Sequence, residues 1–516
     1  MQQSQSKQQV GGILGFIERI GNKIPDITIL FISAFLLVCV VSAVLAQIHF
    51  NYVHPATGKP IEITNMLSGK ALVDLMSKMV TNYANFPPLS MVIVATLGIG
   101  IADGSGYINT GLKKILSITP KVLITPVVIL VGMLSHLGPD SGYVIIIPIA
   151  AYMFYAVGKH PLAGIAASFA GIAGAFAANY TPSAIDPVIQ GFTQSAAQII
   201  DPGYQVNVLC NYFYAFASTF IVIGACWWVT EKITNPWLWK ACPLDDDLDL
   251  GNEHNSSITP SENRAFKIAT AVLLLMLAGL AAALYPADSI LRAPDGVIAS
   301  FKAPIMQSIV SLIFIFAALV GLVYGIACGK FKSPKDVTAA MEEITKTLVQ
   351  LIVFYFFAAQ FLYAFGASNM GALIAVSGAE FLKSLDLPPQ VTVFGIIVFV
   401  ALLNLIITSA SAKWAILAPI FVPMLMAVGI APELTQVAFR VSDSAVNVVT
   451  PMFAFYPLII LYCQKYVKNA GIGTLSSMML PYTIALLVSL TFMLYLFWWL
   501  DIPLGFQADY VYPRRF

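Results

Sequence analysis

Four charged side chains stand inside apolar segments of this sequence and could carry chemistry there. Lys413 lies in the run ITSASAKWAILAPIFVPM, and Arg440 and Asp443 lie three residues apart in RVSDSAVNVVTPM. Asp186 precedes a proline and has no opposite charge near it in the sequence. A lysine at the centre of a bilayer costs about 2.5–3.5 kcal/mol on translocon scales, so ionisable residues at that depth typically mark a substrate or ion pathway.

Each of these residues has a candidate role and an alternative. Arg440 is always protonated and forked, which suits a substrate carboxylate, and Asp443 would position it or exchange a proton; alternatively, the two neutralise each other as i,i+3 neighbours. Asp186 is a candidate proton carrier, unless it only reaches interfacial water. Lys413 could bind a substrate carboxylate, pair with a buried aspartate, fill a cation site with its own ammonium, or simply face lipid or the core. Trp414 beside it offers a flat face to an aromatic ligand.

The composition places these residues in a membrane protein. The chain has 516 residues, of which 58% are hydrophobic and only 10% charged, whereas soluble domains carry about 25% charged residues. Apolar runs of membrane-spanning length recur along it. The net charge of +1 gives no reason to expect nucleic acid as a partner. The six cysteines form no CxxC pair, so we expect neither a disulfide framework nor a metal site.

The distribution of Lys and Arg predicts a cytoplasmic N-terminus. If the segments between successive spans alternate sides, seventeen of these residues fall on the side of the N-terminus and eight on the other, with Lys413 and Arg440 left inside apolar segments. This bias follows the positive-inside rule. The C-terminal pair Arg514 and Arg515 runs against it, so the last helix is the part of this orientation that the charges support least.

Two apolar stretches are interrupted by polar tips and predict re-entrant hairpins. Residues 122–158 carry SHLGPDSG at their centre, and residues 391–428 carry TSASAK. The arms of the first are about 16 residues, or about 24 Å of helix, which is short for a hydrocarbon core of about 30 Å. Irregular backbone at that depth is tolerated only where protein buries it or it lines a wet cavity.

The two halves of the chain resemble each other. GYVIIIPIAAYMFYAVGKHP (142–161) and KWAILAPIFVPMLMAVGIAP (413–432) align without gaps, with matched prolines and Val-Gly pairs. By the charge count the two hairpins enter from opposite sides, so the repeats are predicted to be inverted, a pattern typical of secondary transporters.

The predicted fold is an all-α polytopic membrane protein with about nine transmembrane helices plus two re-entrant hairpins in two inverted-topology repeats. Its segments are a cytoplasmic N-terminal segment (1–27), a first transmembrane helix (28–48), a first repeat (82–232, with hairpin 122–158 and broken helix 161–200), a cytoplasmic polar loop (233–265), two connecting transmembrane helices (266–328), a second repeat (347–500, with hairpin 391–428 and broken helix 433–463) and a C-terminal tail (501–516).

Breaks within the two broken helices add ion-coupling candidates. Freed carbonyls and the hydroxyls of Thr181 and Thr450, each followed by a proline, could bind a cation. At the first hairpin tip, His136 and Asp140 could lie in a wet vestibule.

At these residues the chain resembles the p-aminobenzoyl-glutamate transporter (AbgT) family of the ion-transporter superfamily. SASAKWAILAPIFVPMLM, RVSDSAVNVVTPM, AIDPVIQG, HPLAGIAASFAG and GTLSSMMLPY carry the resemblance, which runs nearly end to end. It implies a homodimer in the bacterial inner membrane. The functional residues that it implies here are Asp186, Ser411, Trp414, Pro432, Arg440, Asp443 and Pro451.

The resemblance implies uptake of p-aminobenzoyl-glutamate or export of sulfonamide antimetabolites, driven by an ion gradient and without a bound cofactor. In members of that family the first hairpin tip usually has a Ser-Asn pair followed by a glutamate. The tip here instead contains His136 and Asp140, which favours protons over sodium. The alternative substrate is another dicarboxylate or a small peptide-like anion, with sodium as the coupling ion. A passive channel is a further alternative. An enzyme is not expected, because the sequence contains neither HExxH nor GxSxG.

Overall fold

The protein is described from a computed structural model that covers residues 26–53, 58–135, 142–245, 258–300 and 302–514. Throughout these ranges the regular elements are helices, joined by turns and two isolated β-bridges. Seven helical runs are long and apolar enough to cross a membrane, which confirms the predicted all-α polytopic fold. They are α2 (Ile27–Leu45), α3 with α4 (Gly69–Ser105), α10 with η4 and α11 (Tyr212–Ala241), α12 (Pro260–Leu284), α14 (Ile309–Ala327), α16 (Val349–Ala367) and α22 (Ile472–Trp499).

The other predicted spans are pairs of shorter helices. Helices α8 (Pro161–Gly174) and α9 (Ile185–Ala197) flank an irregular break at residues 175–184. Helices α20 (Pro432–Val446) and α21 (Tyr456–Gln464) flank a second break at residues 447–455. None of the four reaches the length of about 20 residues that a complete crossing requires.

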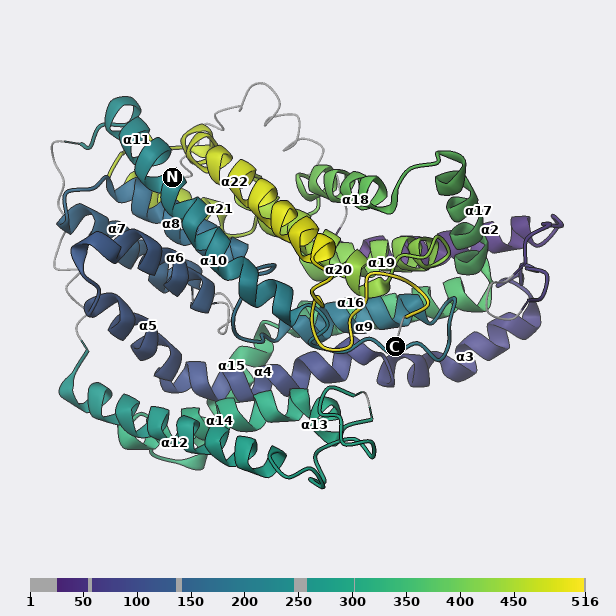
Figure 1. The fold of residues 1–516 in the computed structure, drawn as a ribbon, viewed down its shortest axis with the longest axis horizontal. Helices are drawn as coiled ribbons and strands as arrows, with labels where there is room; N and C mark the ends of the chain where they lie inside the picture. The colour runs from purple at the N-terminus through teal and green to yellow at the C-terminus, as the bar shows by residue number, and fades with distance from the viewer. Residues whose placement is uncertain (1–25, 54–57, 136–141, 246–257, 301, 515–516) are drawn as a thin grey trace, which may run out of the picture.

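Two stretches of the chain have the same order of helices; in Figure 1 the hairpin arms of the first lie to the left and those of the second to the right. In each stretch a long helix is followed by a short helix, two hairpin arms, a broken pair and a closing long helix. The inverted relation between them stays a prediction. The first stretch is α4 (Pro87–Ser105), α5 (Tyr107–Ser117), α6 (Ile124–Leu134), α7 (Ile147–Ala156), α8, α9 and α10 (Tyr212–Val229); the second is α16, α17 (Met370–Ser384), α18 (Pro389–Asn404), α19 (Ala410–Met426), α20, α21 and α22.

Helix α8 is the centre of the first stretch, and every one of its residues is buried. Its sequence is rich in Gly and Ala, which allows α6 and α7 to pack closely against it. At Gly171 a Cβ atom would lie 2.4 Å from the carbonyl oxygen of Ile129 on α6, so no other residue fits there without a shift of the backbone. The small residues therefore bring the first hairpin against the first broken helix.

Several elements lie where the sequence analysis assigned none. Helix α3 (Gly69–Ala84) precedes the span predicted from residue 82, and α15 (Pro334–Lys346) follows α14. Both carry several charged residues, so neither shows the long apolar run by which spans were recognised. The predicted loop 233–265 contains α11 (Asn235–Ala241) and the start of α12, which begins with a capping box formed by Thr259 and Glu262.

Candidate substrate and ion-coupling site

The tip of the second hairpin lies earlier in the chain than the sequence suggested. Helix α18 ends at Asn404, and the Ser409 side chain accepts a hydrogen bond from the backbone N–H of Ala412, which starts α19 at Ala410. Lys413 is therefore in the first turn of α19 and not in the tip itself. The prediction of the tip was wrong by a few residues, because a serine N-cap begins the helix before the apolar run does.

Lys413 is held in a cage of oxygen atoms. Its Nζ lies 2.5 Å from Oδ1 of Asp443, and both side chains are only 1% exposed. It also donates to Oδ1 of Asn404 and to the carbonyl oxygen of Ile407, the latter at 3.0 Å. Asn447 donates to the other carboxylate oxygen of Asp443 at 3.0 Å. Among the alternatives for Lys413, pairing with a buried aspartate is the arrangement observed, and a lipid-facing lysine is excluded.

Arg440 and Asp186 form a second buried ion pair, which joins the two broken helices. Nη1 of Arg440 lies 2.7 Å from Oδ1 of Asp186, and Nε donates to the carbonyl oxygen of Phe176 in the first break at 2.7 Å. The backbone N–H and the hydroxyl of Ser183 donate to Asp186 Oδ2 at 2.7 and 3.1 Å. Asp186 has no opposite charge near it in the sequence, but it is paired in the fold. Its partner comes from a helix about 250 residues away, which local sequence cannot reveal.

The same contacts decide between the two interpretations of Arg440 and Asp443. These neighbours on α20 do not neutralise each other. Arg440 pairs with Asp186 of α9, and Asp443 pairs with Lys413 of α19. The first turns of α9 and α19 thus each contribute one charge to a partner on α20.

Trp414 is covered by protein in this conformation. Its side chain is fully buried, and its ring stacks on Phe439 with the centroids 4.5 Å apart. The indole N–H donates to Oγ1 of Thr193 at 2.9 Å, and Thr193 donates to Gln436 at 2.6 Å. The predicted open face for an aromatic ligand is therefore not available here, because α9 and α20 close over it.

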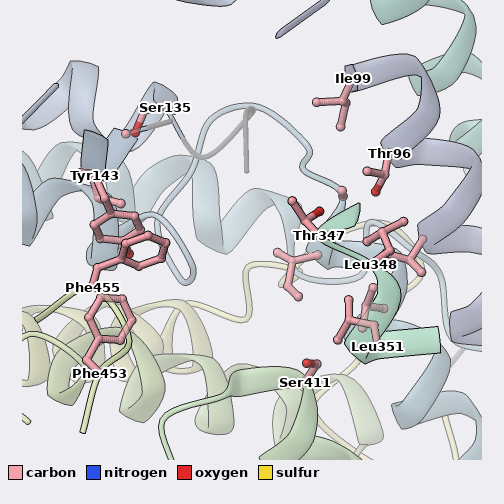
Figure 2. Close-up of a pocket in the computed structure, with 16 residues that line it drawn as sticks. Thr96, Ile99, Ser135, Tyr143, Thr347, Leu348, Leu351, Ser411, Phe453 and Phe455 are labelled. Carbon is pink, nitrogen blue, oxygen red and sulfur yellow. The ribbon is translucent and has the colours of Figure 1, made fainter. Parts of the chain in front are cut away.

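A pocket of about 370 Å³ lies between both hairpins and both breaks. Ser135, which directly follows α6, and Ser411 of α19 are among its lining residues, and Figure 2 shows an aromatic group on one side of it. In that group Tyr143 stacks on Phe455 with the centroids 4.4 Å apart, and Phe453 lies 5.4 Å from Tyr143. On the opposite side Figure 2 shows Thr96, Ile99, Thr347, Leu348 and Leu351.

A second, much smaller cavity of about 10 Å³ touches the Asp186–Arg440 pair. It is lined by polar side chains that include Asn179, Thr181 and Asn211. Such a volume is about what one water molecule needs. The structure thus brings Thr181 together with Asp186 and Arg440.

The remaining predicted residues have separate positions. Thr450 is buried in the second break and donates to the carbonyl oxygen of Leu405 at 2.8 Å, so it ties the break to the hairpin tip. Pro451 lies in the same break, and Pro432 is the first residue of α20. His136 and Asp140 lie outside the described residues. Within the part of the chain that the structure describes, no group of three His, Cys, Asp or Glu side chains is placed to hold a metal ion.

Sequence reasoning missed a third buried ion pair. Glu433 is fully buried on α20 and lies 2.5 Å from Nη2 of Arg514, and the Tyr204 hydroxyl donates to it at 3.0 Å. Residues 501–514 of the predicted tail return to the core, since backbone hydrogen bonds join Ala431 to Tyr510 and Gly429 to Tyr512. Arg514 is therefore not a loop charge of the kind that the orientation count assumed. The signal available in the sequence was Glu433 at the start of the predicted broken helix 433–463, together with an arginine, Arg514, near the C-terminus.

The aromatic group of the central pocket was also missed. Tyr143 stands opposite Trp414 in the alignment of residues 142–161 with 413–432, and Phe453 and Phe455 stand in the run MFAFYP of the second break. Three of the four residues in FAFY (453–456) are aromatic, and this cluster within a predicted helix break was the signal that could have found Phe453 and Phe455.

A model of the AbgT putative transporter family matches residues 12–512. The chain belongs to the AbgT transporter family. It is 33% identical to the p-aminobenzoyl-glutamate transport protein of Escherichia coli (strain K12) over 511 residues, which are 99% of this chain and 98% of that one.

Two solved structures of this family have the same fold. The Neisseria gonorrhoeae MtrF structure, described as illuminating a class of antimetabolite efflux pumps, has a TM-score of 0.90 and 39% identity and covers 96% of this chain and all of its own. The Alcanivorax borkumensis YdaH transporter, described as having an unusual topology, has a TM-score of 0.87 and 37% identity and covers 93% of this chain and all of its own. The AbgT-family chain is thus a multi-pass membrane transporter and not an enzyme.

Proposed function

We propose that this chain is an inner-membrane secondary transporter that moves p-aminobenzoyl-glutamate and sulfonamide antimetabolites in exchange for, or together with, protons. One observation carries the proposal. Two buried ion pairs, Asp186–Arg440 and Lys413–Asp443, join α20 to the first turns of α9 and α19. The residues beside them, Ile185 and Ser411, line the central pocket.

The pocket suits the aromatic part of the ligand. Its volume of about 370 Å³ is in the range of about 300–1,000 Å³ that small-molecule sites occupy. p-Aminobenzoyl-glutamate has one aniline ring, which the stacked pair of Tyr143 and Phe455 would receive. Sulfonamides share that ring, which would allow one pocket to serve both ligands.

The two carboxylates of p-aminobenzoyl-glutamate need cationic partners, and Arg440 is the one whose fork matches a carboxylate. Because Asp186 already holds it, binding requires an exchange of partners. Protonation of Asp186 removes its charge and releases Arg440 to the substrate. A proton and a dicarboxylate would then bind together, which describes uptake.

The same aspartate would act in the opposite sense toward a sulfonamide. This ligand has no carboxylate but has N–H donors, which a deprotonated Asp186 accepts. Proton and sulfonamide would then compete for one group, which is the requirement for exchange. The direction of transport follows from the gradients and from which ligand is present.

Protons are favoured over sodium as the coupling ion by the surroundings of Lys413. Carbonyl, amide and carboxylate oxygens of Ile407, Asn404 and Asp443 surround its ammonium group. These are the ligands that a hard cation takes, and the lysine already supplies the positive charge. We further propose a homodimer with a cytoplasmic N-terminus, on the basis of the family and of the charge distribution.

The test is transport by purified protein in proteoliposomes. Labelled p-aminobenzoyl-glutamate is followed under a pH gradient, under a sodium gradient and under neither. Movement that needs the pH gradient supports the proposal. Movement that needs sodium would favour the alternative of a sodium-coupled dicarboxylate carrier, and flux without any gradient would indicate a passive channel.

A further inference from the structure

A basic hollow lies at one end of helix α10, away from the central pocket. It has a volume of about 640 Å³ and is lined by three lysines, one glutamate and two tryptophans. The lining residues come from the start of the first hairpin, from its end, from the last turns of α10 and from the residues directly after α10. The charged and aromatic members are Lys121, Lys159, Lys232, Glu231, Trp227 and Trp228.

The charges of this hollow leave an excess of positive charge. Lys159 lies 2.5 Å from Glu231, and Thr125 donates to the same carboxylate oxygen at 2.5 Å. That pair is partly buried and forms one wall of the hollow. In the described part of the chain neither Lys121 nor Lys232 has an ion-pair partner, and both are exposed. Two uncompensated positive charges therefore face the hollow.

An apolar groove continues from the basic hollow. It has a volume of about 630 Å³, lies between α10 and α22, and shares Trp228 with the hollow. Figure 1 shows these two helices running side by side along the outside of the molecule. Its lining is aliphatic or aromatic apart from Ser489, and several of these side chains are exposed, such as Ile484, Val488 and Phe492.

The local backbone shapes this junction. After α10 the chain makes a π-helical turn, η4 (Thr230–Thr234), which contains both Glu231 and Lys232. Such turns are rare and are frequent at functional sites. Gly224 lines the hollow about two turns earlier, and a Cβ atom there would meet nothing within 4 Å. The hollow is thus open space beside an exposed tryptophan, a residue that favours the membrane interface.

We propose that the hollow and the groove together bind one anionic phospholipid, with the phosphate near Lys121 and Lys232 and an acyl chain between α10 and α22. Basic pockets between transmembrane helices bind anionic headgroups, and the apolar groove suits an acyl chain and not a free anion. The glutamate does not oppose this assignment, because Lys159 neutralises it. The site is distinct from the transport pocket, so the proposal does not depend on the substrate.

Native mass spectrometry of the purified full-length protein tests the proposal directly. Dioleoyl-phosphatidylglycerol and dioleoyl-phosphatidylcholine are titrated in parallel, so that only the headgroup differs, and inorganic phosphate is added in a third arm. We expect phosphatidylglycerol to bind more tightly than phosphatidylcholine and inorganic phosphate not to compete. Lys121→Gln and Lys232→Gln should each reduce phosphatidylglycerol binding about fivefold, as expected for a lysine near an anionic lipid.

Two further variants keep the test decisive. Gly224→Leu places a side chain in the open hollow and should reduce binding of phosphatidylglycerol while all lysines stay in place. Lys335→Gln with Lys383→Gln removes two exposed charges elsewhere and should leave binding unchanged. Equal binding of the two lipids, or equal losses in the Lys121/Lys232 and control variants, would overturn the proposal. Competition by inorganic phosphate would replace the lipid by a soluble anion and would equally overturn it.

Discussion

Lys413 and Asp443 form an ion pair 2.5 Å apart in which both side chains are almost completely buried. The pair joins the second hairpin to the second broken helix. Removal of one partner leaves an uncompensated charge in a medium of low polarity, whereas removal of both leaves none. The pair therefore couples the position of α19 to that of α20 through charge balance.

We expect Lys413→Met to destabilise the protein by about 3–5 kcal/mol, the usual effect of breaking a buried pair. The double variant Lys413→Met/Asp443→Asn should recover most of that loss. Thermal unfolding in detergent measures both. Lys346→Met breaks the exposed pair with Glu343 and serves as the control that changes little. A double variant as unstable as the single one would contradict the role of charge balance.

Asp186→Asn removes the charge that holds Arg440 and mimics the protonated carboxyl. Because Arg440 is then free of its partner, we expect p-aminobenzoyl-glutamate to bind at least as tightly as to the unchanged protein, while its accumulation under a pH gradient is abolished. Binding by calorimetry and uptake in proteoliposomes separate the two effects. Asp288→Asn, an exposed aspartate in a loop, is the matched control. Normal gradient-driven uptake by Asp186→Asn would exclude the aspartate as the coupling group.

Arg440 should distinguish the two ligand classes. Loss of charge-assisted hydrogen bonds, about 1.5–3 kcal/mol, predicts a decrease of about 10- to 100-fold in affinity for p-aminobenzoyl-glutamate in the Arg440→Gln/Asp186→Asn variant. A sulfonamide, which has no carboxylate, should lose much less. The double substitution avoids leaving Asp186 unpaired. Equal losses for both ligands would indicate general damage to the site and not loss of a carboxylate partner.

Substitutions of Tyr143, in the aromatic group of the pocket, and of Trp414 should differ in their effects: the first should lower ligand affinity and the second should lower stability. Tyr143→Leu removes a ring that lines the pocket and should weaken both ligands by about 0.5–1.5 kcal/mol. Trp414→Phe keeps the stacking on Phe439 but loses the hydrogen bond to Thr193. It should lower stability by about 1 kcal/mol and leave affinity unchanged. A large loss of affinity in Trp414→Phe would mean that the indole contacts ligand in another conformation.

Local patterns in the sequence were sufficient for the architecture. Apolar runs, polar interruptions and prolines follow one another along the chain, and they predicted the all-α fold and the interrupted segments. They failed where a helix is polar, as in α3, because its pattern is that of an exposed amphipathic helix.

The site was predicted in its members but not in its pairings. Lys413, Asp186, Arg440 and Asp443 were recognised because charges are rare in apolar segments. A buried aspartate was one of the alternatives for Lys413, but the sequence did not identify which aspartate pairs with Lys413 and which with Arg440. The contact between Asp186 and Arg440 joins segments about 250 residues apart in the sequence. A single sequence does not indicate which segments so far apart lie next to each other in the fold. The burial of Trp414 was missed for the same reason, since its covering residues come from α9 and α20.

The C-terminal segment should be part of the folded core. Arg514 reaches Glu433, which is fully buried at the start of α20. We expect Arg514→Gln to destabilise the protein by about 3–5 kcal/mol, since it leaves Glu433 without its counter-charge. The double variant Glu433→Gln/Arg514→Gln should recover most of the loss, and Arg264→Gln, which changes an exposed arginine near the start of α12, is the control.

Because α20 also carries Arg440, the single variant Arg514→Gln should in addition weaken binding of p-aminobenzoyl-glutamate. Thermal unfolding and ligand binding report the two effects, and an Arg514→Gln protein that matches Arg264→Gln in both would show that the tail merely rests on the surface of α20.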